Sequence, residues 1–242
     1  MLARDPDLFL KSLSDAFFDQ TLSQPTPTRN AHFFYGAKYA AIARLIALDR
    51  IIPKFENLSK KSHTAERKFE EDQLLYGFFT NALSAMESFC FGAYFIGTVL
   101  SPSHFEPNPK LRCMDPKLTR NCFEKFATNS AFTKALKTSI DSQEYRTISA
   151  VRNMLSHRII PGRIINASTR AGVDLPDSWN LDQWHEGDWS SEGPGISKPP
   201  PKIEFLLESK SLIELRDWSE QQLELLGKNL QSLAASKGLS KD

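Results

Sequence analysis

The sequence predicts an all-α protein. The helices are expected to form an up-and-down bundle, with an irregular insertion before the last helix. Apolar residues recur at helical spacing through most of the chain, whereas residues 159–207 hold six of the 14 prolines. The composition of the 242 residues, 40% hydrophobic and 24% charged, is typical of a globular protein and excludes wholesale disorder. We expect one domain over residues 1–242.

Two helices are predicted in the first quarter of the chain. Residues 5–20 carry apolar side chains every four residues, and a break at 23–28, SQPTPT, follows them. A longer periodic stretch then predicts a helix over 29–52, closed by Pro53, because proline interrupts a helix interior. We therefore expect residues 1–28 to form an N-terminal helix and linker, and the main bundle to cover 29–158.

The next predicted helix covers residues 65–100 after a polar linker, and its apolar part resembles a membrane span. Between Leu74 and Leu100 the only formally charged side chain is Glu87. A carboxylate at the centre of a bilayer would be costly, so a buried helix of a bundle is the favoured interpretation. The aspartates near the N-terminus also leave no apolar stretch for a secretion signal, and we expect a cytoplasmic protein that does not contact a membrane.

The remaining elements follow a proline-rich loop at 102–116. Helical spacing predicts helices near 118–137 and over 141–158, and a final amphipathic helix over 211–235, within a C-terminal helical segment of 208–236. Inside the insertion at 159–207, two short runs at 163–165 and 202–207 could pair as a β-hairpin.

The sequence predicts no metal site and no cofactor. Cys90, Cys113 and Cys122 form no CxxC pair, and the five histidines lack zinc-finger spacing. No phosphate-binding glycine loop or dinucleotide-binding glycine pattern occurs either.

Charge is distributed unevenly along the chain. Residues 110–170 contain 12 Lys and Arg against 4 Asp and Glu, whereas residues 171–197 contain six acids and neither Lys nor Arg. A basic stretch can bind a phosphate backbone, but it can equally be a solvated helix surface. The acidic stretch carries Trp179, Trp184 and Trp189, which we expect to pack on the protein rather than stack on bases, because the acids would repel phosphate.

Polar residues that could take part in catalysis lie near the end of the helix predicted at 141–158. On that helix Ile148, Val151 and Leu155 form an apolar stripe, and Asn153 and His157, four residues apart, share another face.

Arg146 joins Asn153 on that second face, which points away from the apolar stripe. Arg152 does not, because five residues separate it from His157, an angle of about 140° on an ideal helix. Long-range reach of the arginine, or two copies of the helix across a symmetric dimer, would bring Arg152 and His157 together.

The hexapeptide Arg152-Asn-Met-Leu-Ser-His157 resembles the R-polar-x-x-x-H signature of the HEPN superfamily. These are small helical-bundle domains found in prokaryotic toxins and defence proteins. The resemblance implies a composite ribonuclease site across a homodimer, with RNA as substrate and an antitoxin protein as a further partner.

In this interpretation each residue has a role in metal-independent RNA cleavage that leaves a 2′,3′-cyclic phosphate. His157 would act as general base or acid, Arg152 would stabilise the charged transition state, and Asn153 would orient the imidazole or bind phosphate. Arg146, Arg158 and Arg163 would contact the RNA backbone.

Several alternatives stay open, among them a helical regulator that binds a small molecule in a preformed pocket. Glu87 is a carboxylate in need of a partner, and a structural Glu87–Arg152 pair would make Arg152 a residue that locks the bundle. The whole chain could also be a catalytically inactive RNA-binding or protein-interaction module that keeps the motif for dimer geometry.

Overall fold

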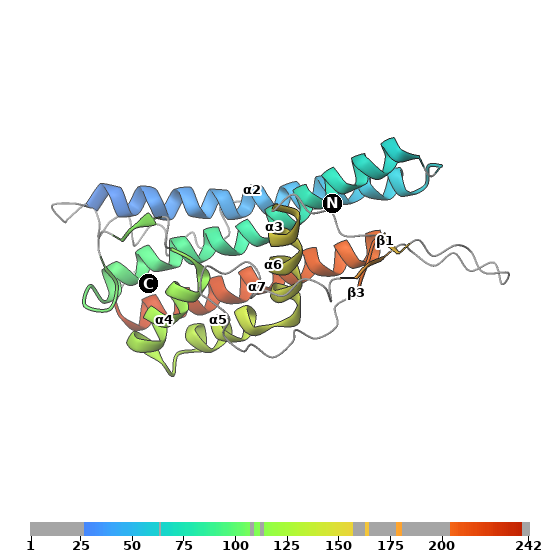
Figure 1. The fold of residues 1–242 in the computed structure, drawn as a ribbon. Helices are drawn as coiled ribbons and strands as arrows, with labels where there is room; N and C mark the ends of the chain where they lie inside the picture. The colour runs from blue at the N-terminus through green and yellow to red at the C-terminus, as the bar shows by residue number, and fades with distance from the viewer. Residues whose placement is uncertain are drawn as a thin grey trace. The chain divides into compact units, whose positions relative to one another are not determined.

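The computed structural model describes residues 27–62, 64–106, 109–111, 114–156, 163–164, 178–180 and 204–238 (Figure 1). These residues are mostly helical, which confirms the predicted all-α class and is consistent with a bundle. The described helices are α2 (Pro27–Ser59), α3 (Ala65–Leu100), α4 (Pro116–Ala127), α5 (Ala131–Asp141), α6 (Gln143–Ser156) and α7 (Ser209–Ser236). The helix predicted over 5–20 lies outside the described residues.

The described chain forms two compact units. The first takes its residues from 1–46, 84–142 and 218–242, and the second takes its residues from 47–83 and 143–217. Helices α2, α3 and α7 each contribute one part to the first unit and another to the second.

Helix α2 does not end at Pro53, as the sequence analysis predicted, but continues through it to Ser59. A proline inside a helix removes one backbone hydrogen bond and costs about 3 kcal/mol. The residues beyond it explain why the helix continues, since Phe55 and Leu58 are only 1% and 5% exposed. Burial of two large apolar side chains offsets the loss at the proline.

Helix α3 runs from Ala65 to Leu100, as predicted, and α7 begins two residues before the predicted start and ends one residue after the predicted end. Helix α3 is long and apolar enough to cross a membrane, although 67% of its most apolar window is buried by the rest of the protein. Core helices of globular proteins share these properties, so α3 alone does not decide where the protein is found.

The single helix predicted near 118–137 is in fact two helices, α4 and α5, separated by Thr128–Ser130. Ser130 caps α5, because its Oγ accepts a hydrogen bond from the backbone N–H of Thr133 at 3.1 Å. Asp115 caps α4 in the same way, with Oδ1 2.6 Å from the N–H of Leu118. Capping side chains favour a helix start over a continuous helix, and the periodicity alone did not reveal this break.

Aromatic rings form the core of the first unit. The ring of Phe105 lies 5.3 Å from that of Tyr94 on α3 and 4.8 Å from that of Phe123 on α4, and Phe123 lies 4.6 Å from Phe132 on α5. All four rings are buried. Because they come from four successive segments, they join α3, the loop after it, α4 and α5 into one core.

A glycine on α3 makes room for this core. A Cβ at Gly97 would lie 2.6 Å from Cδ1 of Phe105 and closer still to two other atoms of its ring. Only glycine lets that ring approach the backbone of α3 so closely.

The second unit combines parts of α2, α3 and α7 with α6 and three short strands. Phe79 of α3 packs edge-on against Phe205, with ring centroids 5.2 Å apart. Arg216 of α7 donates through Nε to Oδ1 of Asp49 on α2 at 2.7 Å, with both side chains about one-fifth exposed. These contacts fix the strands and α7 to the hairpin of α2 and α3.

The strands correct the predicted hairpin. Strands β1 (Arg163–Ile164) and β3 (Glu204–Leu206) form near the predicted positions, but they do not pair with each other. Both pair antiparallel with β2 (Ser178–Asn180), which the sequence analysis did not predict. A three-residue strand carries too few residues for an alternating pattern to be recognised.

We predict that Gly97→Ala lowers the free energy of unfolding by about 1–3 kcal/mol, because the added methyl group overpacks the Phe105 ring. Gly36→Ala on α2 is the matched control, since a Cβ there would meet no atom within 4 Å apart from its chain neighbours and the nearby backbone of the helix itself. It should raise the free energy by about 0.5–1 kcal/mol through helix propensity. Chemical denaturation followed by circular dichroism measures both, and equal effects of the two substitutions would contradict the packing.

Candidate functional site

Helix α6 follows α5 with one extended residue between them. Ser142 has φ −69° and ψ 157°, and its N–H donates to the carbonyl of Ser139. The buried residues of α6 share one face. They are Thr147, Ile148, Val151 and Met154. The predicted stripe is therefore right at Ile148 and Val151, whereas Leu155 is only half-buried and Met154 is buried in its place.

Arg152 and Asn153 lie half-buried near the end of α6. Nη1 of Arg152 donates a hydrogen bond to Oδ1 of Asn153 at 2.9 Å. An ideal helix turns by about 100° between neighbouring residues, so the length of the arginine side chain brings its guanidinium round to the amide. The carbonyl of Arg152 accepts a hydrogen bond from Oγ of Ser156 at 2.8 Å.

Arg152 forms no ion pair with the described residues of its own unit. No described carboxylate of the second unit lies within ion-pair distance of it, and its described hydrogen-bond acceptor is the neutral amide of Asn153. A half-buried guanidinium with a neutral partner retains its positive charge and donor groups for an incoming anion.

The other predicted site residues are placed as follows. Arg146 is exposed on α6, and the backbone of Arg163 pairs with that of Trp179 in the register of β1 and β2. His157 and Arg158 lie outside the described residues, which end at Ser156 in this part of the chain. The approach of His157 to Arg152 thus stays a prediction.

Glu87 is half-buried on α3 and belongs to the first unit, whereas Arg152 belongs to the second. Within the first unit, Oε2 of Glu87 accepts from Oγ of Ser84 at 3.5 Å. The Glu87–Arg152 pair stays a prediction.

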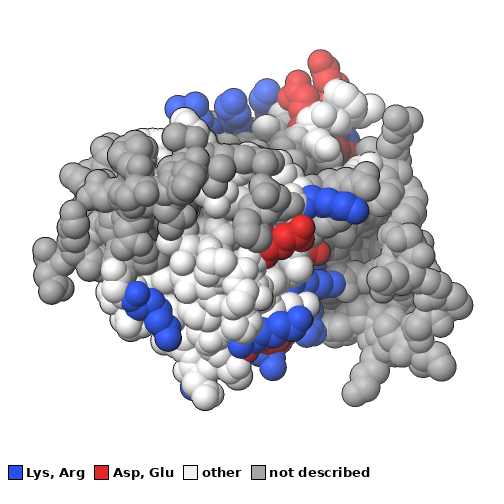
Figure 2. Space-filling model, turned by 90° about the vertical axis from the view of Figure 1, so that its left-hand side faces the viewer, with Lys and Arg blue, Asp and Glu red and all other residues white. Residues whose placement is uncertain are grey.

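The basic stretch of residues 110–170 is partly neutralised by its own acids. Arg120 on α4 lies 3.8 Å from Glu124 and 3.6 Å from Asp141 on α5. Figure 2 shows one face of the molecule, on which Lys and Arg side chains occur in small groups among uncharged surface, with a few Asp and Glu side chains beside them. Both interpretations of this stretch, as a phosphate-binding surface and as a solvated helix surface, therefore stay open.

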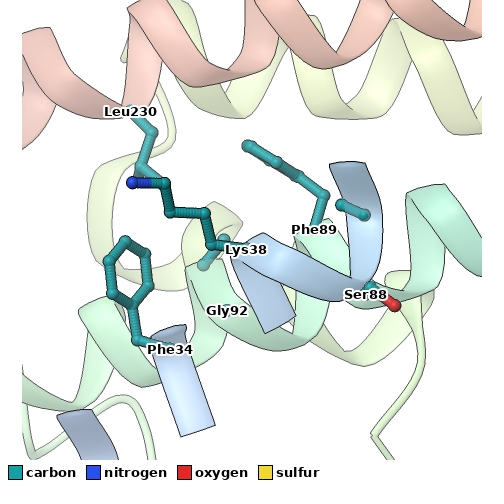
Figure 3. A pocket seen from close by; sticks show the side chains of 8 residues that line it. Phe34, Lys38, Ser88, Phe89, Gly92 and Leu230 are labelled. Carbon is teal, nitrogen blue, oxygen red and sulfur yellow. The ribbon is translucent and has the colours of Figure 1, made fainter. Parts of the chain in front are cut away.

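A small cavity in the first unit is lined by a buried lysine. Lys38 is 6% exposed, and its side chain extends from α2 towards Leu230 of α7, between Phe34 and Phe89 (Figure 3). The cavity measures about 10 Å³, which is room for one water molecule at most. It is too small for a substrate.

A larger groove lies in the second unit, on the hairpin of α2 and α3. Its volume is about 400 Å³, within the usual range for a ligand site. The residues that line it are Lys54, Asn57, Leu58, Lys61, Glu70 and Leu74. Sequence analysis missed this groove, because it ended the helix at Ile52 and took residues 57–66 as a linker.

The described cysteines do not favour thiolate chemistry. Burial raises the pKa of the Cys90 thiol far above its ordinary value, and the negative charges of Asp115 and Glu87 raise it further. Burial also raises the pKa of Cys122. Both thiols are protonated at neutral pH, so neither is a nucleophile there. Among the described residues, no three His, Cys, Asp or Glu side chains gather closely enough to hold a metal ion.

No protein-family model matches this chain, and neither the curated proteins nor the solved structures contain a significant match to it. The assignment of a function therefore depends on the residues of the site themselves.

We predict that Arg152→Ala changes the free energy of unfolding by less than about 1 kcal/mol, because the side chain is half-buried and donates to a neutral amide. Ile148→Ala, on the buried face of the same helix, should cost about 2–5 kcal/mol. Thermal and urea unfolding measure both. A loss at Arg152 as large as that at Ile148 would show that the arginine locks the fold, as the Glu87 pair would require.

Proposed function

We propose that the protein is a metal-independent endoribonuclease of the defence or toxin–antitoxin type, with Arg152, Asn153 and His157 in a composite site across a homodimer. The observation that supports this best is the hydrogen bond between Arg152 and Asn153 near the end of α6. Both are residues of the motif that resembles the HEPN signature, and no carboxylate among the described residues of the unit pairs with the guanidinium.

The proposed reaction is an attack within the RNA strand. A base removes the proton of a 2′-hydroxyl, the 2′-oxygen forms a bond to the adjacent phosphorus, and the bond from phosphorus to the 5′-oxygen breaks. An acid then gives a proton to the departing 5′-oxygen, so the products are a 2′,3′-cyclic phosphate and a 5′-hydroxyl. No water, metal or cofactor enters the balance of this step.

His157 is the side chain of the motif that can both take and give a proton near neutral pH. Arg152 would bind the two non-bridging oxygens as negative charge develops on them, with Asn153 holding the guanidinium in place. Arg146, Arg158 and Arg163 would contact neighbouring phosphates. The proposed partners are RNA, a second copy of the chain and an antitoxin protein.

We predict that the wild-type protein cleaves end-labelled RNA in EDTA and leaves 2′,3′-cyclic phosphate ends. His157→Ala should reduce the rate by about 10²–10⁴-fold, because the proton transfers lose their catalyst. Arg152→Ala should reduce it by about 10²–10³-fold through loss of transition-state stabilisation. If the folded wild-type dimer cuts none of a varied set of RNAs, the inactive binding module becomes the better interpretation.

We also predict that mixing the Arg152→Ala and His157→Ala proteins restores cleavage that neither has alone. In a composite site, one of the two sites of a mixed dimer receives Arg152 from one protomer and His157 from its partner. The measurement is cleavage after subunit exchange, with each variant alone at the same total concentration as control. An active wild type without recovery in the mixture would place the whole site within one protomer.

A further inference from the structure

The groove of the second unit is built from two helices at regular spacing. Asn57, Leu58 and Lys61 lie three, four and seven residues after Lys54, along α2 and the turn after it, so all four share one side. Glu70 and Leu74, four residues apart, face them from α3. The groove therefore combines an apolar floor with charged and amide groups.

The charged groups of the groove lie outside the ion pairs that the described residues form with one another. Among the described residues, Lys54, Lys61 and Glu70 take part in no ion pair, and all three side chains are exposed. The backbone carbonyl of Lys61 accepts a hydrogen bond from Nη1 of the buried Arg67. Arg67 in turn pairs through Nε with Glu71 at 2.7 Å. The turn that carries Lys61 is thus held in place while its ammonium group stays available.

We propose that this groove binds one nucleotide of a single-stranded RNA. The ammonium groups of Lys54 and Lys61 would neutralise the phosphates on either side of that nucleotide, and Leu58 and Leu74 would contact the face of its base. The inference rests on the proposed RNA substrate and adds a binding site to it. The groove belongs to the same unit as Arg152 and Asn153.

Glu70 selects the base in this arrangement. A carboxylate accepts a hydrogen bond from an exocyclic amino group, as cytosine carries at N4, but repels the carbonyl oxygen that uracil carries at the same position. Asn57 offers both a donor and an acceptor to the rest of the base edge. The groove should therefore favour cytosine over uracil.

The test measures binding of the full chain to fluorescent 2′-O-methyl oligocytidylate and 2′-O-methyl oligouridylate. These strands lack the 2′-hydroxyl, so they are not cut by the proposed reaction. We expect the cytidine strand to bind at least about fivefold more tightly, the lower limit for one good base contact. Glu70→Ala should abolish this preference, whereas Glu66→Ala, which removes an exposed acid of α3 outside the groove, should retain it.

The phosphate contacts are tested by a double variant and a matched control, each of which replaces two lysines by alanine and so loses the same charge. The slope of log affinity against log salt is negative for a strand held by phosphate contacts. Lys54→Ala with Lys61→Ala should make it less steep by about 1.4, the value for two contacts on a single strand. Lys60→Ala with Lys68→Ala removes two exposed lysines that do not line the groove and should leave the slope nearly unchanged. All four lysines are exposed, and circular dichroism verifies that the variants fold.

Two results would overturn the inference: equal slopes for the two double variants, or equal affinity of the wild type for the two strands. Its failure is separable from failure of the nuclease proposal. If the protein cleaves RNA but shows none of these groove effects, the nuclease proposal stands and the groove proposal is rejected. If binding depends on the groove but no RNA is cleaved, the groove proposal stands and the nuclease proposal is rejected.

Discussion

The absence of a side chain at Gly97 is the constraint on which the first unit depends. It lets the Phe105 ring lie against α3, so the chain after that helix turns back and delivers Phe123 and Phe132 to the same core. Helices α4 and α5 therefore form as a packed pair with their own caps. The chain then leaves α5 at Asp141, and one extended residue later begins the helix that carries the motif.

Helix α6 carries its buried residues and the proposed site residues on different sides. Its buried face supplies the stability, which leaves the side of Arg152 and Asn153 little constrained by the core. The amide of Asn153 holds the Arg152 guanidinium in position without neutralising its positive charge, whereas a carboxylate partner would neutralise that charge. The anionic substrate that we propose would need such a guanidinium.

The long helices could be predicted from the sequence, whereas the exact ends of some helices could not. Helix α3 has the predicted bounds because 36 residues give a strong periodic pattern. The continuation of α2 past Pro53 depends on burial of Phe55 and Leu58, which only the tertiary structure reveals. The same error hid the groove, since Lys54 was placed after the end of its helix.

The candidate site was predictable in part. Spacing identified the residues of the motif, but a face-by-face count placed Arg152 and Asn153 on different sides of the helix. The contact between them depends on the flexible arginine side chain, which a helical projection does not include. The groove gave no signal at all, because its six residues come from two helices and a turn that pack only after folding.

The sharing of α2, α3 and α7 between the two units has a consequence for folding. Neither unit is formed by a single continuous piece of chain, and the boundaries between them fall inside these three helices rather than in exposed linkers. A helix that frays in one unit removes the turns on which it propagates into the other. Unfolding should therefore be cooperative across both units, and neither can be excised as an independent fragment without cutting three helices in their interiors.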